Sequence, residues 1–167
     1  MAVFEATIPS DWTADDTFGY LAVFSNAEQW DPGVLEGEEL DPGPVRVGSR
    51  FRLVVPFVGR KLELIYRVTE FSAGDRHVVL DAASKFMRAS DRIAVRPASA
   101  RAGATVSYRA EVTLAGPLGL LDPVLSHGFR AVGERAAAGL TSALASRESA
   151  PGRPGSPGVP GTAAKKP

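Results

Sequence analysis

Four polar side chains lie in segments of alternating polarity, on the side that apolar residues otherwise occupy. They are Tyr66, Ser84, Asp91 and Tyr108. Side chains an even number of residues apart in a strand point to the same face, so we expect these groups to face the protein interior. An enclosed carboxyl group such as that of Asp91 has a raised pKa unless it is paired, and it can then act as an acid or a base.

Each of these groups also has a purely structural interpretation. Most acidic side chains are solvated, so Asp91 could lie in water at a strand end or pair with a basic neighbour. A tyrosine often packs its ring in the core while its hydroxyl reaches solvent or a polar partner, so Tyr66 and Tyr108 need not touch a ligand. The residue types alone leave both interpretations open.

Metal and cofactor chemistry has little support in the sequence. There is no cysteine, and the only histidines are His77 and His127. Neither has a second histidine or a suitably placed acid at metal-ligand spacing. The chain also contains no Gly-x-Ser-x-Gly nucleophile segment and no Gly-x-x-x-x-Gly-Lys phosphate loop. We therefore expect no metal site and no cofactor.

The elements that must position these side chains are mostly strands. Alternation of apolar and polar residues predicts a strand at Val3–Ile8 and five more between Gly48 and Leu114, at 51–57, 61–68, 77–82, 92–96 and 106–114. One apolar and one polar face per strand is typical of an antiparallel sheet that is solvated on one side. Short Gly-containing breaks between the segments predict hairpins and hence a meander.

Helical patterns flank this block of strands. Thr13 is a suitable N-cap for a helix that runs to about Ser25, and 26–30 predicts a second short helix. After Pro117 an apolar stripe with spacings of three and four predicts a long helix, with a kink or a fresh start near Asp122 because a proline follows it. The stripe comprises Leu118, Leu121, Leu125, Phe129, Val132, Ala136, Leu140 and Leu144.

Charge is unevenly distributed, although nineteen basic residues balance nineteen acidic ones. Residues 1–45 hold ten acids and no lysine or arginine, and residues 46–167 hold all nineteen bases. This asymmetry indicates either complementary surfaces within one domain or at a subunit contact, or a basic face for an anionic ligand or membrane. The zero net charge argues against a general nucleic-acid binder.

The length of 167 residues and the composition suit one domain with a tail. We assign the domain to residues 1–147 and read 148–167, with its Pro-Gly repeats, as a disordered tail. The N-terminus shows no secretory signal pattern, and no apolar stretch approaches the ~18 residues of a membrane helix. A cytoplasmic protein without a transmembrane segment is therefore expected.

Six segments, in this order and spacing, resemble the SRPBCC superfamily, which has the START-like helix-grip fold, and more narrowly its polyketide cyclase/dehydrase and lipid-transport branch. They are 18–33, 47–51, 64–70, 91–97, 103–108 and 133–140. Relatives often carry an acid where this chain has Val23, a departure with little bearing on the fold. The resemblance covers about residues 3–146.

The resemblance implies an α+β fold. A seven-stranded antiparallel sheet would wrap around a long C-terminal helix, with two short helices after the first strand and an apolar cavity between sheet and helix. Inward-facing apolar residues are candidates for the cavity wall or the core, which sequence does not separate. The candidate ligand-binding residues are Trp30, Phe51, Leu53, Leu64, Leu80, Ile93, Ala110, Leu121, Leu125 and Phe129. Trp30 could equally anchor its helix in the core.

Three functions are compatible with this sequence. The first is binding of a hydrophobic small molecule, lipid-, sterol- or polyketide-like, in the cavity. The second is a polyketide cyclase/dehydrase of the aromatase type, in which Asp91, Tyr66 and Tyr108 transfer protons. The third is a non-catalytic partner-binding module that uses the basic sheet face. A homodimer is compatible with all three, and fold alone does not choose between them.

Overall fold

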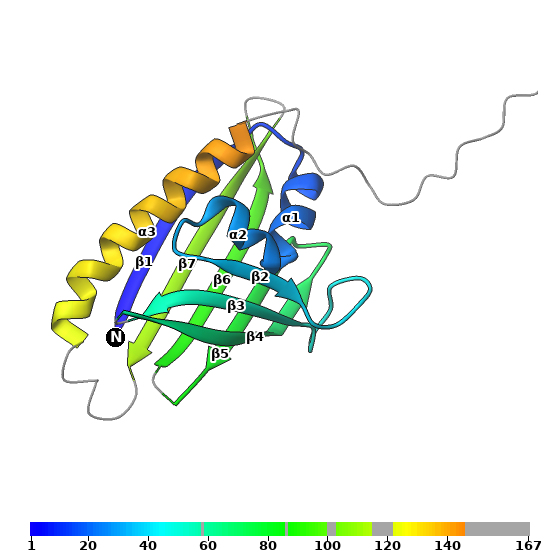
Figure 1. Ribbon diagram of the computed structural model, residues 1–167. Helices are drawn as coiled ribbons and strands as arrows, with labels where there is room; N and C mark the ends of the chain where they lie inside the picture. The colour runs from blue at the N-terminus through cyan, green and yellow to red at the C-terminus, as the bar shows by residue number, and fades with distance from the viewer. Residues whose placement is uncertain (58, 86, 100–102, 115–121, 146–167) are drawn as a thin grey trace, which may run out of the picture.

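The computed structural model describes residues 1–57, 59–85, 87–99, 103–114 and 122–145 (Figure 1), with the side chains of 122–127 left aside. The predicted tail, 148–167, and the domain boundary before it lie outside these residues. So do Leu118 and Leu121 of the predicted apolar stripe.

Seven strands form one antiparallel sheet in the order β1-β7-β6-β5-β4-β3-β2. The predicted meander is present from β3 to β7, with β2 added at one edge and the first strand, β1, beside β7. The strands are β1 (Ala2–Ser10), β2 (Glu36–Glu39), β3 (Arg50–Phe57), β4 (Arg60–Ser72), β5 (His77–Ala83), β6 (Met87–Pro97) and β7 (Ala104–Leu114). The α+β helix-grip architecture that the resemblance implied is confirmed.

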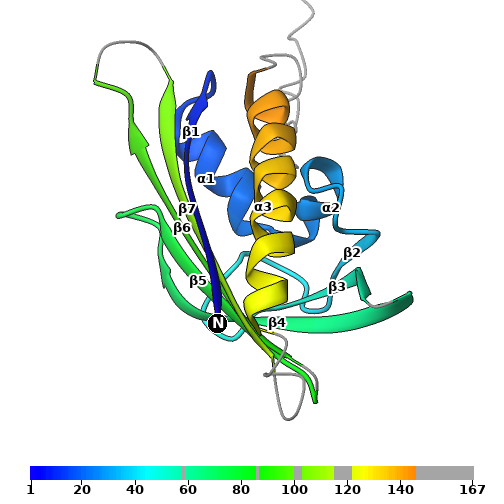
Figure 2. The same cartoon turned by 90° about the vertical axis from the view of Figure 1, so that its left-hand side faces the viewer.

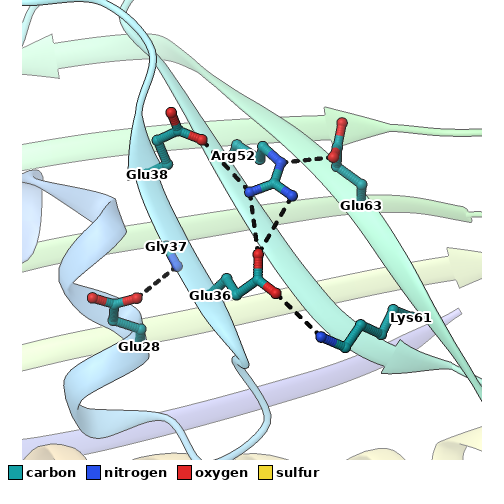
Figure 3. Close-up of polar contacts among 7 residues, drawn as sticks. All are labelled: Glu28, Glu36, Gly37, Glu38, Arg52, Lys61 and Glu63. Carbon is teal, nitrogen blue, oxygen red and sulfur yellow. Dashed lines mark hydrogen bonds and ion pairs between the residues drawn. The ribbon is translucent and has the colours of Figure 1, made fainter.

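The edge strand β2 is the element that the residue pattern did not predict. Its sequence, Glu-Gly-Glu-Glu, shows no apolar alternation, because it lies at the sheet edge and is largely exposed. Two contacts hold it in place: Glu28 accepts a hydrogen bond from the Gly37 backbone N–H at 2.8 Å (Figure 3), and a Cβ on Gly37 would lie 2.2 Å from the Ser25 carbonyl oxygen. Backbone pairing with β3 and close approach to Ser25, not hydrophobic burial, therefore position this strand.

The helices before β2 begin as predicted but end differently. α1 (Ala14–Ala22) has Thr13 as its N-cap, and the Thr13 hydroxyl accepts a hydrogen bond from the Asp16 N–H at 3.1 Å. The helix stops before Ser25, and a short 3₁₀ turn, η1 (Phe24–Asn26), follows it. The predicted second helix is present as α2 (Ala27–Trp30).

The long helix α3 (Asp122–Ala145) begins at the residue where a fresh start was predicted, with Pro123 in its first turn. It crosses the same side of the sheet as α1 and α2 (Figure 2). Two glycines allow this close packing. A Cβ on Gly133 would lie 2.3 Å from the Phe4 ring, and one on Gly139 would lie 1.9 Å from the Trp30 carbonyl oxygen.

Among the described side chains of the predicted apolar stripe, those in the second half of α3 are buried. Ala136, Leu140 and Leu144 are 3% exposed or less. Val132, which the stripe also included, is 38% exposed. Val132 lines the cavity, and none of the described elements covers it there.

Ion pairs within the domain account for part of the charge asymmetry of the sequence. Ion pairs join acids of the first 45 residues to later bases: Asp15–Arg76, Asp41–Arg50, Glu36–Arg52, Glu38–Arg52, Glu36–Lys61 and Glu5–Arg109. Figure 3 shows the part of this network around Arg52, which also binds Glu63 on the neighbouring strand. The prediction of complementary surfaces within one domain therefore accounts for these residues.

Candidate functional site

A cavity of about 330 Å³ lies between the inner face of the sheet, the turn after α2, and α3. Its wall includes Leu53, Val55 and Phe57 of β3, Leu64 and Tyr66 of β4, Met87, Ala89 and Asp91 of β6, Tyr108, Ala110 and Val112 of β7, Trp30 with Asp31–Val34, and Phe129, Val132, Arg135 and Ala136 of α3. This volume is at the lower end of the ~300–1,000 Å³ typical of ligand pockets, so it suits a compact molecule.

Small side chains on the central strands leave this space open. Ala89 on β6 and Ala110 on β7 line the cavity where larger residues would fill it. Ala82 on β5 pairs with Tyr66 of β4 on one side and with Ala89 on the other. On β5 the side chain beside Tyr66 is only the methyl group of Ala82. The Tyr66 side chain can therefore reach across β5 to the carboxyl group of Asp91 on β6.

Three polar groups meet at the buried end of the cavity. Asp91 is 4%, Tyr66 7% and Tyr108 8% exposed. The Tyr108 hydroxyl donates a hydrogen bond to Asp91 Oδ1 at 2.6 Å. The Tyr66 hydroxyl lies near enough to the Asp91 carboxyl group to lower its pKa. The predicted inward orientation of all three is therefore what the structure has. The alternative that Asp91 lies at a strand end in water does not hold.

Burial dominates the electrostatics of this cluster. It raises the pKa of Asp91 to about 6, although the hydroxyls of Tyr108 and Tyr66 act in the opposite direction. Burial and the nearby Asp91 carboxylate raise the pKa values of both tyrosines well above their usual range. The hydroxyls therefore keep their protons at neutral pH, whereas Asp91 titrates close to it.

A second polar pair lies at the mouth of the cavity. Asp31, directly after α2, accepts a hydrogen bond from the Gly33 N–H at 2.7 Å. Burial raises the pKa of Asp31, against the lowering effects of the Gly33 N–H and of the Arg135 guanidinium. Sequence reasoning missed both side chains: Asp31 follows the predicted short helix in an Asp-Pro-Gly segment that is typical of a turn, and Arg135 lies beside, not on, the apolar stripe of α3.

Five of the ten predicted ligand-binding residues line the cavity: Trp30, Leu53, Leu64, Ala110 and Phe129. Trp30 is both wall and anchor, because it is 4% exposed and its ring meets Tyr108 edge-on, with centroids 6.1 Å apart. Leu121 and the side chain of Leu125 lie outside the described residues.

Phe51, Leu80 and Ile93 do not line the cavity. They are 1%, 0% and 1% exposed, respectively, so neighbouring side chains surround them and leave no surface for a ligand. These three residues belong to the core. Inward orientation, which the alternation predicted, is common to core and cavity wall, and so the pattern could not distinguish the two.

Ser84, the fourth inward candidate, is not in the cavity wall. It lies in the turn between β5 and β6, where its hydroxyl accepts a hydrogen bond from the Met87 N–H at 3.2 Å. His77 points to the outer face of the sheet, as predicted, beside Arg92 and Arg109 in a shallow open hollow.

Neither metal ligation nor membrane spanning has a structural candidate in the described part of the chain. No three His, Asp or Glu side chains there are close enough to hold a metal ion. None of the described helices combines the length and apolar character needed to cross a bilayer.

A curved antiparallel sheet, a long helix across it and a cavity between them define a START-like, ligand-binding domain of the SRPBCC superfamily. The chain belongs to the family described as polyketide cyclase/dehydrase and lipid transport, whose model matches residues 1–145. The resemblance seen in the sequence is thereby confirmed. No curated protein matches the sequence.

Solved structures of distant sequence share this fold. A START superfamily protein from Mycobacterium smegmatis is 15% identical, with a TM-score of 0.64 over 86% of this chain and 97% of that one. TTHA0849 from Thermus thermophilus is 17% identical, with a TM-score of 0.66 over 84% of this chain and 94% of that one. The di-domain ARO/CYC BexL of the BE-7585A biosynthetic pathway is 18% identical, with a TM-score of 0.58 over 84% of this chain and 46% of that one.

Proposed function

We propose that this protein binds one compact hydrophobic molecule in the cavity between the sheet and α3. The observation that carries the proposal is a 330 Å³ space with a largely apolar wall and one polar cluster at its buried end. Apolar burial supplies affinity at roughly 25 cal/mol per Å² before ordering costs, and a few polar groups set orientation.

The shape of the site supports entry from the side of α3. Val132 and Arg135 are exposed on α3, and Pro32 is exposed opposite them, while all three line the cavity. Apolar surface left open at such a rim is typical of a ligand entrance. The ligand residues that we propose are Trp30, Leu53, Leu64, Ala110 and Phe129, together with the Asp91 cluster.

Native mass spectrometry of the purified protein, followed by organic extraction, tests this proposal. We expect a co-purified or added apolar molecule at a ratio of one per chain. The variant Ala89→Phe fills the cavity and should abolish the complex. Ser90→Phe places the same ring one residue along β6 on the outer face and should leave binding intact. Equal binding by both variants would place the ligand elsewhere.

A second candidate function, cyclisation and dehydration of a polyketide-like ketone, is favoured by one observation. Asp91 is a buried carboxyl group whose pKa of about 6 suits proton transfer near neutral pH. In a dehydration, the Asp91 carboxylate would take the proton on the carbon beside the ketone. Asp91 would then give this proton to the hydroxyl on the next carbon, which leaves as water, and the electron pair of the broken C–H bond would form the carbon–carbon double bond.

This second function is tested with a bicyclic β-hydroxy ketone, whose dehydration gives an aromatic chromophore. General acid–base groups contribute ~10²–10⁴-fold to a rate, so Asp91→Asn should lower turnover by that factor while ligand binding persists. Turnover that is unchanged in Asp91→Asn, or absent from the unmodified protein, would leave binding as the sole function.

A further inference from the structure

Two carboxyl groups line the ligand cavity, and neither has a counter-ion among the described residues. Asp91 lies at the buried end and is 4% exposed, and Asp31 lies at the mouth and is partly buried. They accept hydrogen bonds from a phenol and from a backbone N–H, and the described ion pairs include neither of them. Because burying a charge is costly unless an opposite charge accompanies it, the negative charge here is left for a ligand to balance.

Arg135 is the one cation on the described part of the wall, and it does not cancel these charges. It is exposed on α3, and its Nε donates a hydrogen bond at 3.1 Å to the Ala131 carbonyl oxygen of its own helix. Its charge lowers the pKa of Asp31. The charged groups with the strongest effect on the pKa of Asp91 are instead Asp31 and Asp81, and both raise it. The buried end of the cavity is therefore negative whenever Asp91 is ionised.

Much of the remaining wall consists of aromatic rings. Two edge-on pairs, Phe24 with Tyr66 at 4.9 Å and Trp30 with Tyr108 at 6.1 Å between centroids, bring rings to the end where Asp91 lies. The face of an aromatic ring attracts a cation, so such a wall suits a substituted ammonium group better than aliphatic side chains would. The seven rings that line the cavity are Phe4, Phe24, Trp30, Phe57, Tyr66, Tyr108 and Phe129.

We infer that the ligand of this cavity is an apolar molecule with one cationic nitrogen, a substituted ammonium group, at the end that reaches Asp91. The inference rests on the proposed function and specifies the charge of its ligand. A single positive charge would balance Asp91 and reduce its repulsion with Asp31, whereas an anionic group would add a third negative charge. Carbonyl groups elsewhere in the ligand are compatible with this inference and hence with the second candidate function.

Two isosteric probes test the charge of the ligand separately from its shape and its hydrogen bonds. Benzyltrimethylammonium carries a permanent positive charge and no N–H, and neopentylbenzene has a carbon atom in place of the nitrogen. Because neither probe titrates, any change in affinity with pH belongs to the protein. Equilibrium dialysis at pH 5 and at pH 8 gives the dissociation constants of both probes.

The cation should bind about tenfold more tightly at pH 8 than at pH 5. With a pKa of about 6, Asp91 is about one-tenth ionised at pH 5 and almost fully ionised at pH 8. Tyr66 and Tyr108 keep their protons over this range, Arg135 keeps its charge, and ionisation of Asp31 acts in the same direction as that of Asp91. Neopentylbenzene should gain no affinity as the pH rises, because it offers no charge to the carboxylate.

Two matched variants locate the effect. Asp91→Asn keeps the shape of the side chain and resembles the protonated acid, so it should weaken binding of the cation at pH 8 about tenfold and abolish the gain with pH. Neopentylbenzene should still bind this variant, which shows that the cavity is intact. Asp81→Asn makes the same change on the outer face of β5, where Thr69 donates to the carboxyl group at 2.8 Å. That variant should leave the affinity of both probes at pH 8 unchanged.

The outcomes distinguish this inference from the proposed function. If neopentylbenzene binds but the cation does not, or if the cation binds without a gain at pH 8, the inference is wrong and the cavity remains a binding site. An equal gain in Asp91→Asn would also overturn the inference. Binding of neither probe overturns it as well, and the native mass spectrum then decides separately on the proposed function.

Discussion

Charged side chains have different surroundings on the two faces of the sheet. Among the described residues, Asp91 is the one buried carboxyl group; it lies on the inner face, is 4% exposed and accepts a hydrogen bond from the Tyr108 phenol. The outer face carries arginines on most strands, and several pair with acids from the first part of the chain. Arg109, for example, contacts both Glu5 and Glu111.

Solvent explains this difference. On the outer face water screens each charge, so ion pairs there are individually weak and even like charges are tolerated. Arg92 stands directly opposite Arg109 in the pairing of β6 with β7, an arrangement that only a solvated face accommodates. On the inner face dehydration controls ionisation, and it moves the pKa of Asp91 close to neutral. The same strands therefore hold a reactive side and an inert one.

The largest difference between the faces should appear when side chains are truncated. Leu80 is fully buried, so Leu80→Ala should lower the free energy of unfolding by about 2–5 kcal/mol. Arg88→Ala, at an exposed outer position on β6, should change it by at most ~0.5 kcal/mol. Urea unfolding followed by circular dichroism measures both. Similar losses in the two variants would mean that the inner core is not what stabilises the fold.

The pH dependence of stability should have opposite signs for acids on the two faces. Folded Asp91 keeps its proton up to about pH 6, but in the unfolded chain only to about pH 3.9. Its contribution to stability is therefore complete below pH ~4 and is lost as the pH rises through 6. At ~1.4 kcal/mol per pKa unit the loss is about 3 kcal/mol, and Asp91→Asn should abolish it.

An outer-face acid gives the opposite sign. The Arg50 guanidinium lowers the pKa of Asp41, so the stability from this pair is present at neutral pH and is lost as the pH falls. Unfolding curves from pH 3 to 8 for Asp91→Asn and Asp41→Asn check both signs. A parallel pH dependence in the two variants would contradict the assigned environments.

Two glycines of α3, Gly139 in a packed position and Gly128 in an open one, allow a similar comparison. Gly139→Ala forces a methyl group against the Trp30 carbonyl oxygen, 1.9 Å from the ideal Cβ position, and should cost about 1–3 kcal/mol by overpacking. Gly128→Ala meets no atom within 4 Å and should stabilise the helix by ~0.5–1 kcal/mol. Thermal unfolding gives both values, and a stabilising Gly139→Ala would contradict the close contact with α2.

The smallest effect concerns the like charges of the outer face. Arg92→Glu creates an opposite-charge pair with Arg109 across β6 and β7 and should stabilise by about 0.2–1 kcal/mol. Arg96→Glu, which faces Thr105, is the matched control and should bring no such gain. Unfolding at low and high salt checks the origin, because screening should remove the gain. A gain that salt leaves intact would not be electrostatic.

Periodicity was sufficient for most elements, because side-chain direction follows from local backbone geometry. The alternation around Asp91 and Tyr108 placed both on the inner face, and Thr13 marked the start of α1. The edge strand β2 was missed because its residues have no hydrophobic partner to create a pattern. Gly37 lies so close to the Ser25 carbonyl oxygen that a Cβ would not fit there. Local sequence patterns do not predict this contact between two segments.

The sequence by itself determined which side chains face inward, where α3 begins and that the fold is a helix-grip. Only the tertiary structure decided which inward residues line a cavity. Leu53 borders open space and Leu80 does not, although both alternate identically, because packing depends on what the other elements bring to the same place. The approach of Tyr66 to Asp91 across β5, and the effect of the Arg135 charge on the pKa of Asp31 at the mouth, likewise required the assembled sheet and helix.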